Sequence, residues 1–220
     1  MVTTINKEEH TMKIAVIGAT GKAGQKIVEE AVQRGHEVTA IVRSAAKVTT
    51  AIPVIEKDVF HLTQDEMKDF DVVVNAFGAP AGQEDLHVKA GRHLIGIFEG
   101  IDTKLFVVGG AGSLFVDPEK QIRVMETPDF PAMFLATAQN QGQNLQDLQQ
   151  SAIQWTFLSP SAFFDPEGPR TGHYITGVDH LLVNEAGDSY VSYADYAVAV
   201  LDELENPQHQ NSRFTVTSNK

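Results

Sequence analysis

The chain has 220 residues and a mass of 24.0 kDa, the size of one domain, because single hydrophobic cores stop growing near about 250–300 residues. Its 17 Lys and Arg against 29 Asp and Glu give a net charge of −12, so its surface repels phosphate backbones and lipid headgroups, and we expect neither nucleic acid nor a membrane as a partner. The absence of cysteine excludes a disulfide scaffold and thiolate sites, and it fits a cytoplasmic location.

The first part of the chain predicts a tail followed by strand, helix and strand. Residues 1–11 are polar and mixed in charge, so we expect a loose tail. Residues 13–18 form a β-branched run, as in a strand buried on both faces, and the run ends in glycine. Apolar residues recur at helical spacing over 22–34, and Gly35 is suited to end that helix. A second strand is expected over 36–43.

The same alternation continues to residue 112. Further strands are expected at 53–59, 71–77 and 104–110, with helical segments at 63–69 and 84–99. Strands that alternate with helices indicate a parallel sheet joined by right-handed crossovers. The predicted fold class is therefore α/β.

Beyond this point the pattern is less regular. Prolines interrupt 113–134, where no secondary structure is predicted. A Gln-rich helix is expected at about 135–150, followed by a buried strand over 153–160 with Trp155 in the core. Prolines and glycines in 163–172 predict a loop without regular structure, long enough to be functional.

The C-terminal residues predict short strands and one more helix. Short strands or a hairpin are expected between 173 and 192, with a turn at 186–188. An amphipathic helix over 193–204 and a last strand over 213–218 follow. The acidic residues of this helix are expected to form a solvated face: Asp195, Asp202, Glu203 and Glu205. We therefore expect one domain over 12–220, with a substrate-side elaboration mainly in 113–134 and 160–192.

A glycine motif stands where the first strand meets the first helix. Gly18, Gly21 and Gly24 have the spacing GxxGxxG. The first glycine permits a tight turn, the second lets backbone approach a pyrophosphate, and the third lets helix and strand pack closely. In this context the motif predicts a dinucleotide site in a Rossmann-type doubly wound sheet, the alternative being a turn that binds nothing. The residues assigned to it are Gly18, Ala19, Thr20, Gly21, Lys22, Ala23 and Gly24.

The end of the second strand bears on the choice of cofactor. An NAD enzyme normally has an acidic residue there, whereas this chain has Arg43 and Ser44, with Lys47 four residues after Arg43. Charge-assisted hydrogen bonds to a 2′-phosphate contribute about 1.5–3 kcal/mol each, so we expect NADP(H) to be preferred over NAD(H). Arg43, Lys47 and the helix N-terminus would supply local positive potential in this acidic protein. The alternative is that Arg43 is a solvated charge.

Residues after the next strands complete the expected cofactor site. Asp58 and Val59 stand where an adenine edge would lie, unless Asp58 is an ordinary loop carboxylate. The carboxyl ends of the fourth and fifth strands line the crevice where nicotinamide is expected. Phe77 either walls this crevice or caps the core. The residues expected in the crevice are Asn75, Ala76, Phe77, Gly78, Gly109 and Gly110.

With these segments in place, the chain resembles the atypical short-chain dehydrogenase/reductases. Within them it is similar to the NADH-flavin reductase group, close to NmrA-like and biliverdin/flavin-reductase-like proteins. The segments that carry the resemblance are 13–24, 36–43, 71–78, 106–114, 153–161 and 190–207. The resemblance implies a nicotinamide cofactor and a flavin or quinone-like acceptor, with flavin as a substrate rather than a tightly bound group.

The chain departs from typical members of this superfamily by lacking a Tyr-x-x-x-Lys pair. Thr137 and Gln141 stand at about those places, and no tyrosine has a lysine four residues later. Alcohol oxidation, epimerisation and dehydration by the usual proton chemistry are therefore not expected. Flavin reduction does not require this pair, because hydride passes directly to the acceptor and the proton can come from water.

The acceptor pocket is expected around the 113–114 turn and the 161–174 loop. Ser113 and His173 are candidate catalytic residues. The alternatives are a surface serine, a structural histidine and tyrosine, and phenylalanines that belong to the core. No metal site is expected, because His87 and His93 lie on different faces of one helix and no ligand spacing occurs. The residues assigned to the acceptor are Ser113, Leu114, Phe163, Phe164 and Tyr174.

The function expected from these features is an NAD(P)H-dependent oxidoreductase. Hydride would pass from NADPH to a flavin, quinone or similar planar small molecule, in a monomer or homodimer. The alternative is a catalytically silent NADP(H)-binding redox sensor of NmrA type, which would act through a protein partner.

Overall fold

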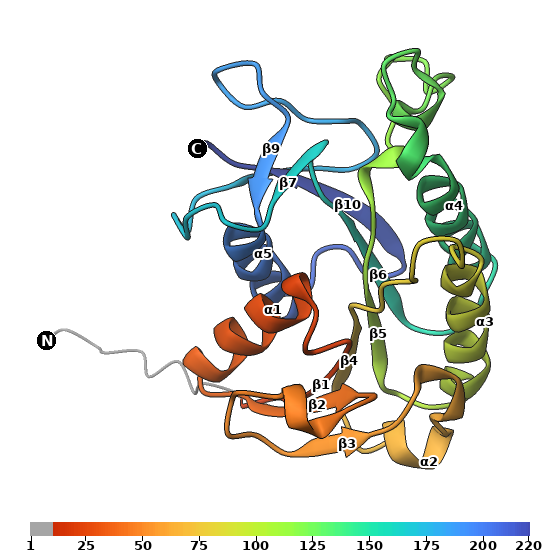
Figure 1. Ribbon diagram of the computed structural model, residues 1–220, viewed down its shortest axis with the longest axis vertical. Helices are drawn as coiled ribbons and strands as arrows, with labels where there is room; N and C mark the ends of the chain where they lie inside the picture. Colours follow the sequence, from red (N-terminus) through yellow and green to blue (C-terminus); the bar gives the residue numbers. More distant parts are fainter. Residues whose placement is uncertain (1–10) are drawn as a thin grey trace, which may run out of the picture.

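The computed structural model describes residues 11–220 and has a mostly parallel sheet between two layers of helices (Figure 1). The expected tail lies outside the described residues apart from Thr11. The strand order is β3-β2-β1-β4-β5-β6-β10-β8, and all neighbours are parallel except β8 and β10. The strands are β1 Lys13–Ile17, β2 Glu37–Val42, β3 Val54–Glu56, β4 Val72–Asn75, β5 Lys104–Val108, β6 Trp155–Ser159, β8 Ile175–Gly177 and β10 Ser212–Thr217. The predicted doubly wound α/β fold is confirmed.

Each face of the sheet has its own helices and core. Side chains alternate along a strand, so Ile14 and Val16 of β1 pack in one core while Ala15 and Ile17 pack in the other. In Figure 1 the first face is covered by α1 and α5, and the second by α2, α3 and α4. None of the helices within residues 11–220 is long and apolar enough to cross a membrane. The helices are α1 Lys22–Gln33, α2 Gln64–Met67, α3 Leu86–Phe98, α4 Leu135–Gln149 and α5 Tyr193–Glu205.

The segment 160–192 differs from the prediction. Part of the expected loop forms a strand, β7 (Phe163–Asp165), which pairs in parallel with β9 (Tyr190–Ser192) as a separate two-stranded sheet. Of the two alternatives expected for 173–192, short strands are confirmed and the hairpin is not, because β8 pairs with β10 instead of β9. The turn at 186–188 is confirmed: Gly187 has a φ of +85°, and its N–H donates to the Asn184 carbonyl.

The solvated acidic face predicted for α5 is also wrong in part. Asp195 is fully buried and accepts hydrogen bonds from the N–H groups of Thr171 and Gly172 at 2.8 Å. Glu203 is buried as well and accepts two backbone N–H bonds from residues 208 and 209. These carboxylates anchor loops that fold back over the helix, which compensates their loss of water.

A cluster of charged groups joins α1 to α5 and to the 165–174 segment. Glu30 is only 4% exposed and accepts hydrogen bonds from Arg34 and from both Nε and Nη2 of Arg170. Arg34 also reaches Asp202 and Glu205 at the end of α5. The hydrogen bonds from Arg170, together with those from Arg34, hold the pKa of Glu30 below its usual value, although burial opposes the shift.

Glu30→Gln should lower the free energy of unfolding at neutral pH by about 1–2 kcal/mol, because two guanidinium groups lose a charged acceptor. The folded-state pKa of Glu30 is depressed, so its stabilisation is present above the ordinary value of 4.5 and is lost as the pH falls through the folded pKa. Urea unfolding should therefore show a difference in unfolding free energy between wild type and Glu30→Gln that is smaller at acid pH than at neutral pH. Two results would contradict this role: a difference in unfolding free energy that does not change with pH, or an equal loss of unfolding free energy in the exposed control Glu29→Gln.

Candidate functional site

The glycine loop after β1 has the geometry that its sequence predicted at two of its three glycines. Gly18 has a φ of +75°, and a Cβ there would lie 2.5 Å from the Ala76 carbonyl oxygen. A Cβ on Gly24 would lie 2.2 Å from the Gly18 carbonyl oxygen, so a side chain would separate α1 from the loop. The tight turn and the close packing of helix on strand are thus both present.

The N-terminus of α1 opens toward solvent without a side-chain cap. Its N-cap residue is Gly21, which has no side chain to accept the N–H groups of the first turn. Lys22, the first helical residue, is exposed. Free N–H groups, the positive end of the helix dipole and a lysine together favour an anion at this place.

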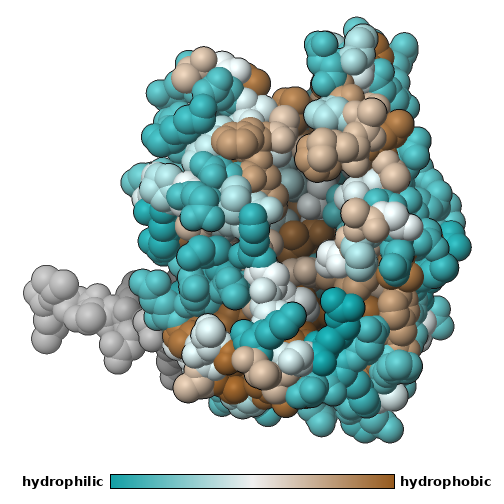
Figure 2. Space-filling view, viewed as in Figure 1, coloured by the Kyte–Doolittle hydropathy of each residue, from teal (hydrophilic) through white to brown (hydrophobic). Residues whose placement is uncertain are grey.

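A cavity of about 450 Å³ extends from this loop across the carboxyl ends of β1, β2 and β4. This volume lies in the range of ligand sites. Figure 2 shows a hollow on this face of the molecule, between the layer of α1 and α5 and the layer of α3 and α4, with apolar side chains on both walls. The cavity is lined by Ile17, Gly18, Thr20, Gly21, Lys22, Ala23, Ile41, Val42, Arg43, Lys57, Asp58, Val59, Ala76, Phe77, Gly78 and Tyr193.

Charged groups gather at the β2 and β3 end of the cavity. Arg43 is exposed at its rim and forms no salt bridge with another residue of the described chain. Lys57, which the sequence analysis did not single out, lines the cavity but pairs with Glu66. Asp58 has a structural role too, because its Oδ1 accepts the N–H of Phe60 at 3.1 Å. Arg43 is therefore the cation left to meet an anionic group here.

Some residues assigned to the cofactor at this end do not line the cavity, namely Ala19, Gly24, Ser44 and Lys47. Ala19 is buried, and Lys47 is exposed beside a shallower depression that also contains Thr20. Ser44 begins the short turn of residues 45–47, whose first N–H donates to Glu56. The structure thus brings Arg43 to the cavity without Ser44 or Lys47.

The turn after β4 forms one wall. Ala76, Phe77 and Gly78 line the cavity, whereas Asn75 is buried and its Oδ1 accepts the N–H of Phe77. The Phe77 ring packs edge-on against Phe60 and against His87, whose pKa is lowered by burial. Phe77 therefore both walls the cavity and covers the core.

The sequence predicts an open crevice beside the glycines after β5, but the structure leaves no open space there. A Cβ on Gly109 would lie 2.1 Å from the Phe157 ring, and one on Gly110 would lie 2.0 Å from Oε1 of Gln141. Gly109 and Gly110 are therefore places where β6 and α4 approach the chain closely, and neither lines the cavity. Thr137 and Gln141, at the places of the missing Tyr and Lys, both lie on α4.

The residues after this turn are also more buried than a substrate surface requires. Leu114 is fully buried, so its assignment to the acceptor is corrected: it belongs to the core. Ser113 is 8% exposed, and its Oγ accepts a hydrogen bond of 3.0 Å from Arg213. Arg213 in turn pairs with Asp179, which ties the segment to β10.

The acceptor residues expected from 161–174 are spread over two places. Phe163 is 54% exposed, and Phe164 packs its ring on Tyr193 at the cavity. Tyr174 lies elsewhere: it packs against the core that α1 and α5 cover, and its hydroxyl donates to Asp202 of α5 at 2.6 Å. His173 is exposed, and the pair of residues 173 and 174 does not line the cavity.

Tyr193 is another lining residue that the sequence analysis missed. In the sequence it has Ala197, not a lysine, four residues later. The sequence signalled only the start of the helix, because Ser192 is a favourable N-cap. The strand before it, β9, belongs to the separate two-stranded sheet, so the place of Tyr193 at the cavity did not follow from the strand order. With Tyr193 included, the titratable side chains of the cavity are Lys22, Arg43, Lys57, Asp58 and Tyr193. Three of these five are basic, and no histidine is among the lining residues, so the lining suits the binding of an anion.

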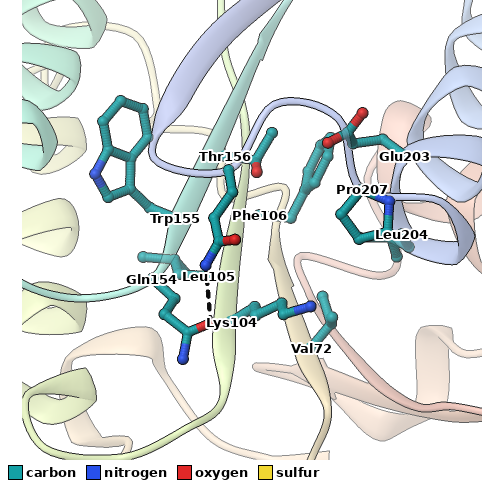
Figure 3. A pocket seen from close by; sticks show the side chains of 11 residues that line it. Val72, Lys104, Leu105, Phe106, Gln154, Trp155, Thr156, Glu203, Leu204 and Pro207 are labelled. Carbon is teal, nitrogen blue, oxygen red and sulfur yellow. Dashed lines mark hydrogen bonds between the residues drawn. The ribbon is translucent and has the colours of Figure 1, made fainter.

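A second depression lies at the amino ends of β4, β5 and β6, at the other end of the strands from the cavity (Figure 3). It is formed by Lys104, Gln154, Glu203 and neighbouring residues, and Gln210 donates a hydrogen bond to Gln154 across it. Its volume of about 20 Å³ suits little more than one water molecule. The cavity at the glycine loop is therefore the better candidate for a ligand site.

Comparison with known proteins agrees with this geometry. The uncharacterized protein YwnB of Bacillus subtilis is 63% identical over 210 residues, which are 94% of this chain and 99% of YwnB. A solved structure from Streptococcus pneumoniae, of a protein proposed to be an NADH-flavin reductase, is 44% identical with a TM-score of 0.91 and covers 94% of this chain and 100% of its own. A protein from Bacteroides thetaiotaomicron proposed to be an epimerase is 35% identical with a TM-score of 0.86, over 96% and 98% of the two chains.

The family match spans almost all of the residues that the structure describes. Residues 18–207 match the model of a family described as NAD(P)H-binding, from the first glycine of the loop to the segment after α5. The predicted resemblance to the atypical short-chain dehydrogenase/reductases is confirmed. The chain therefore belongs to the NAD(P)H-binding family.

Proposed function

We propose that the protein is an NADPH-dependent reductase that passes hydride to a flavin, quinone or similar planar acceptor. The observation that carries this proposal is the cavity itself. It joins an uncapped helix N-terminus, a glycine loop and Arg43, and its lining contains no histidine, the usual general acid or base. Such a lining favours direct hydride transfer over acid–base chemistry.

The proposed division of the site follows the order of the strands. Arg43 would meet the 2′-phosphate at the β2 end, and Val59 the adenine. The N–H groups of the first turn of α1 would meet the pyrophosphate, and Ala76 to Gly78 would lie against the nicotinamide half. The bound nicotinamide supplies the hydride, while this chain holds the cofactor and the acceptor in line.

Exposed apolar side chains support a planar acceptor. Met133 and Phe134 are 79% and 53% exposed on the segment before α4, and Phe163 is 54% exposed on β7. In Figure 1 the segment before α4 and strand β7 both lie in the upper part of the molecule. The three side chains lie outside the lining of the cavity, so they would meet a part of the acceptor that extends beyond it. Exposed apolar side chains favour a ring system that leaves water. The acceptor would take up hydride from the cofactor and one proton from water.

Steady-state oxidation of NADPH tests the proposal. Purified protein should consume NADPH when FMN, riboflavin or a quinone is supplied, and it should consume NADH more slowly. A panel of such acceptors without turnover, at concentrations where NADPH is bound, would overturn the reductase assignment.

A second candidate is a redox sensor that binds NADP(H) without turning it over. It is favoured by the replacement of the Tyr-Lys pair by Thr137 and Gln141, the latter packed against Gly110. The two proposals differ in their measurable outcomes. A sensor would bind both NADP⁺ and NADPH without turning either of them over, and it would co-purify with a protein partner.

A further inference from the structure

Tyr193 is placed differently from the other tyrosines of the chain. The chain has four tyrosines. Three hydroxyl groups are bonded within the protein: Tyr174 donates to Asp202, Tyr190 to Asp165, and Tyr196 to the Leu158 carbonyl, at 2.6–3.0 Å. The hydroxyl of Tyr193 has no such partner among residues 11–220. Tyr193 lines the cavity of about 450 Å³, so we take its unbonded hydroxyl as a group available to a ligand there.

The ring of Tyr193 is fixed by its surroundings. Its centroid lies 3.8 Å from that of Phe164, at an interplanar angle of 50°. Phe164 is held by β7, which pairs with β9, and β9 leads directly into α5. Ser192 caps the helix by accepting the Asp195 N–H at 2.9 Å. A side chain held in this way presents its hydroxyl with little loss of conformational entropy on binding.

The position of Tyr193 within the sheet order identifies the part of a ligand that it faces. One helical turn later, Tyr196 donates to the carbonyl of Leu158 in β6. Strand β6 lies beyond β4 and β5, on the opposite side of β1 from β2, which carries Arg43 to the cavity. A dinucleotide whose 2′-phosphate meets Arg43 would therefore extend its nicotinamide half toward Tyr193.

The hydroxyl is suited to donate a hydrogen bond. Burial raises the pKa of Tyr193, so the phenol stays protonated in neutral solution. The oxygens of a ribose or of the adjacent phosphate are acceptors for such a group.

We propose that the Tyr193 hydroxyl donates a hydrogen bond to a ribose or phosphate oxygen on the nicotinamide half of a bound dinucleotide, with Phe164 as the residue that positions its ring. The proposal rests on the cofactor site proposed above. It assigns Tyr193 a contact with the cofactor and makes the α5 N-terminus the wall opposite the Arg43 end.

Calorimetric titration with two ligands tests this contact. Tyr193→Phe should bind NADP⁺ about 3–10-fold more weakly than the wild type, as expected for one hydrogen bond. Adenosine 2′,5′-bisphosphate, which lacks the nicotinamide half, should bind both proteins equally. Phe164→Leu should reproduce the selective loss in part, because it frees the ring.

Tyr190→Phe is the matched control, since its hydroxyl bonds to Asp165 and does not line the cavity. It should leave both affinities unchanged. Equal NADP⁺ affinity in Tyr193→Phe and wild type, or an equal loss for both ligands, would overturn the proposal. The test does not depend on turnover: a sensor without activity would still show the selective loss, whereas a wild type that binds neither ligand would refute the cofactor site itself.

Discussion

Replacement of Arg43 by alanine should weaken the binding of NADPH about 10–100-fold and leave the binding of NADH within about twofold of wild type. The reason is that the guanidinium lies at the cavity rim without a salt bridge to another described residue, so its charge is available to a 2′-phosphate. NADH has a hydroxyl at that place and gains little from a cation. Fluorescence titration with both cofactors measures the two dissociation constants directly.

The control for this experiment is Arg92→Ala. Arg92 is an exposed arginine on α3 that pairs with Asp147, and it does not line the cavity. The Arg92→Ala substitution removes the same charge as Arg43→Ala. It should change the affinities for NADPH and NADH by no more than about twofold, because exposed charges at a distance are screened by salt. If Arg43→Ala weakened the binding of NADPH and NADH equally, the guanidinium would contact the pyrophosphate that both cofactors share, and the assignment to the 2′-phosphate would be wrong.

Gly24→Ala should both destabilise the protein and weaken cofactor binding. The added Cβ would lie 2.2 Å from the Gly18 carbonyl oxygen and 2.9 Å from its carbon. Both are backbone atoms, so α1 or the glycine loop has to move, which costs about 2–3 kcal/mol of unfolding free energy. The N–H groups at the start of α1 move with it, and NADPH affinity should fall about tenfold or more. Denaturant unfolding and NADPH titration measure the two effects.

Gly96→Ala provides the comparison for that change. Gly96 lies in α3, and a Cβ there would meet no atom within 4 Å. Alanine should stabilise this helix by about 0.5–1 kcal/mol, because it restricts the unfolded chain and favours the helix. A Gly24→Ala protein as stable as wild type, with unchanged affinity, would show that the helix does not depend on this close approach.

The central strands were predictable because their signal is local. The apolar runs at β1 and β4 are buried on both faces, and a strand between two helical layers requires that composition. The glycine loop was predictable for a similar reason. Gly18 and Gly24 each lie where the backbone leaves no room for a side chain, as a strand, a turn and a helix in close succession require.

The errors arose where burial depends on residues distant in sequence. Asp195 looks like a solvated helix residue until the loop at 171–172 folds onto it, and Glu203 is buried in the same way by residues 208 and 209. Strand β7 exists because it pairs with β9, which lies 25 residues or more later in the chain. No local pattern reports such contacts.

The candidate site shows the same division. Its loop and Arg43 follow from the order of strand, turn and helix. Gly110 differs from expectation because Gln141 of α4 packs against it, and Leu114 because it is fully buried. Tyr193 was missed because its role depends on an arrangement of α5, β7 and the cavity that periodicity does not encode.

The most direct test of the reductase proposal is a single turnover with NADPH deuterated on one or the other face of C4. Wild-type protein saturated with NADPH and mixed with FMN, riboflavin or a quinone should oxidise the cofactor. We predict slower oxidation with one deuterated form only, because a cofactor held in one orientation presents one hydrogen to the acceptor. Bound NADPH that stays reduced in the presence of every acceptor would contradict the account.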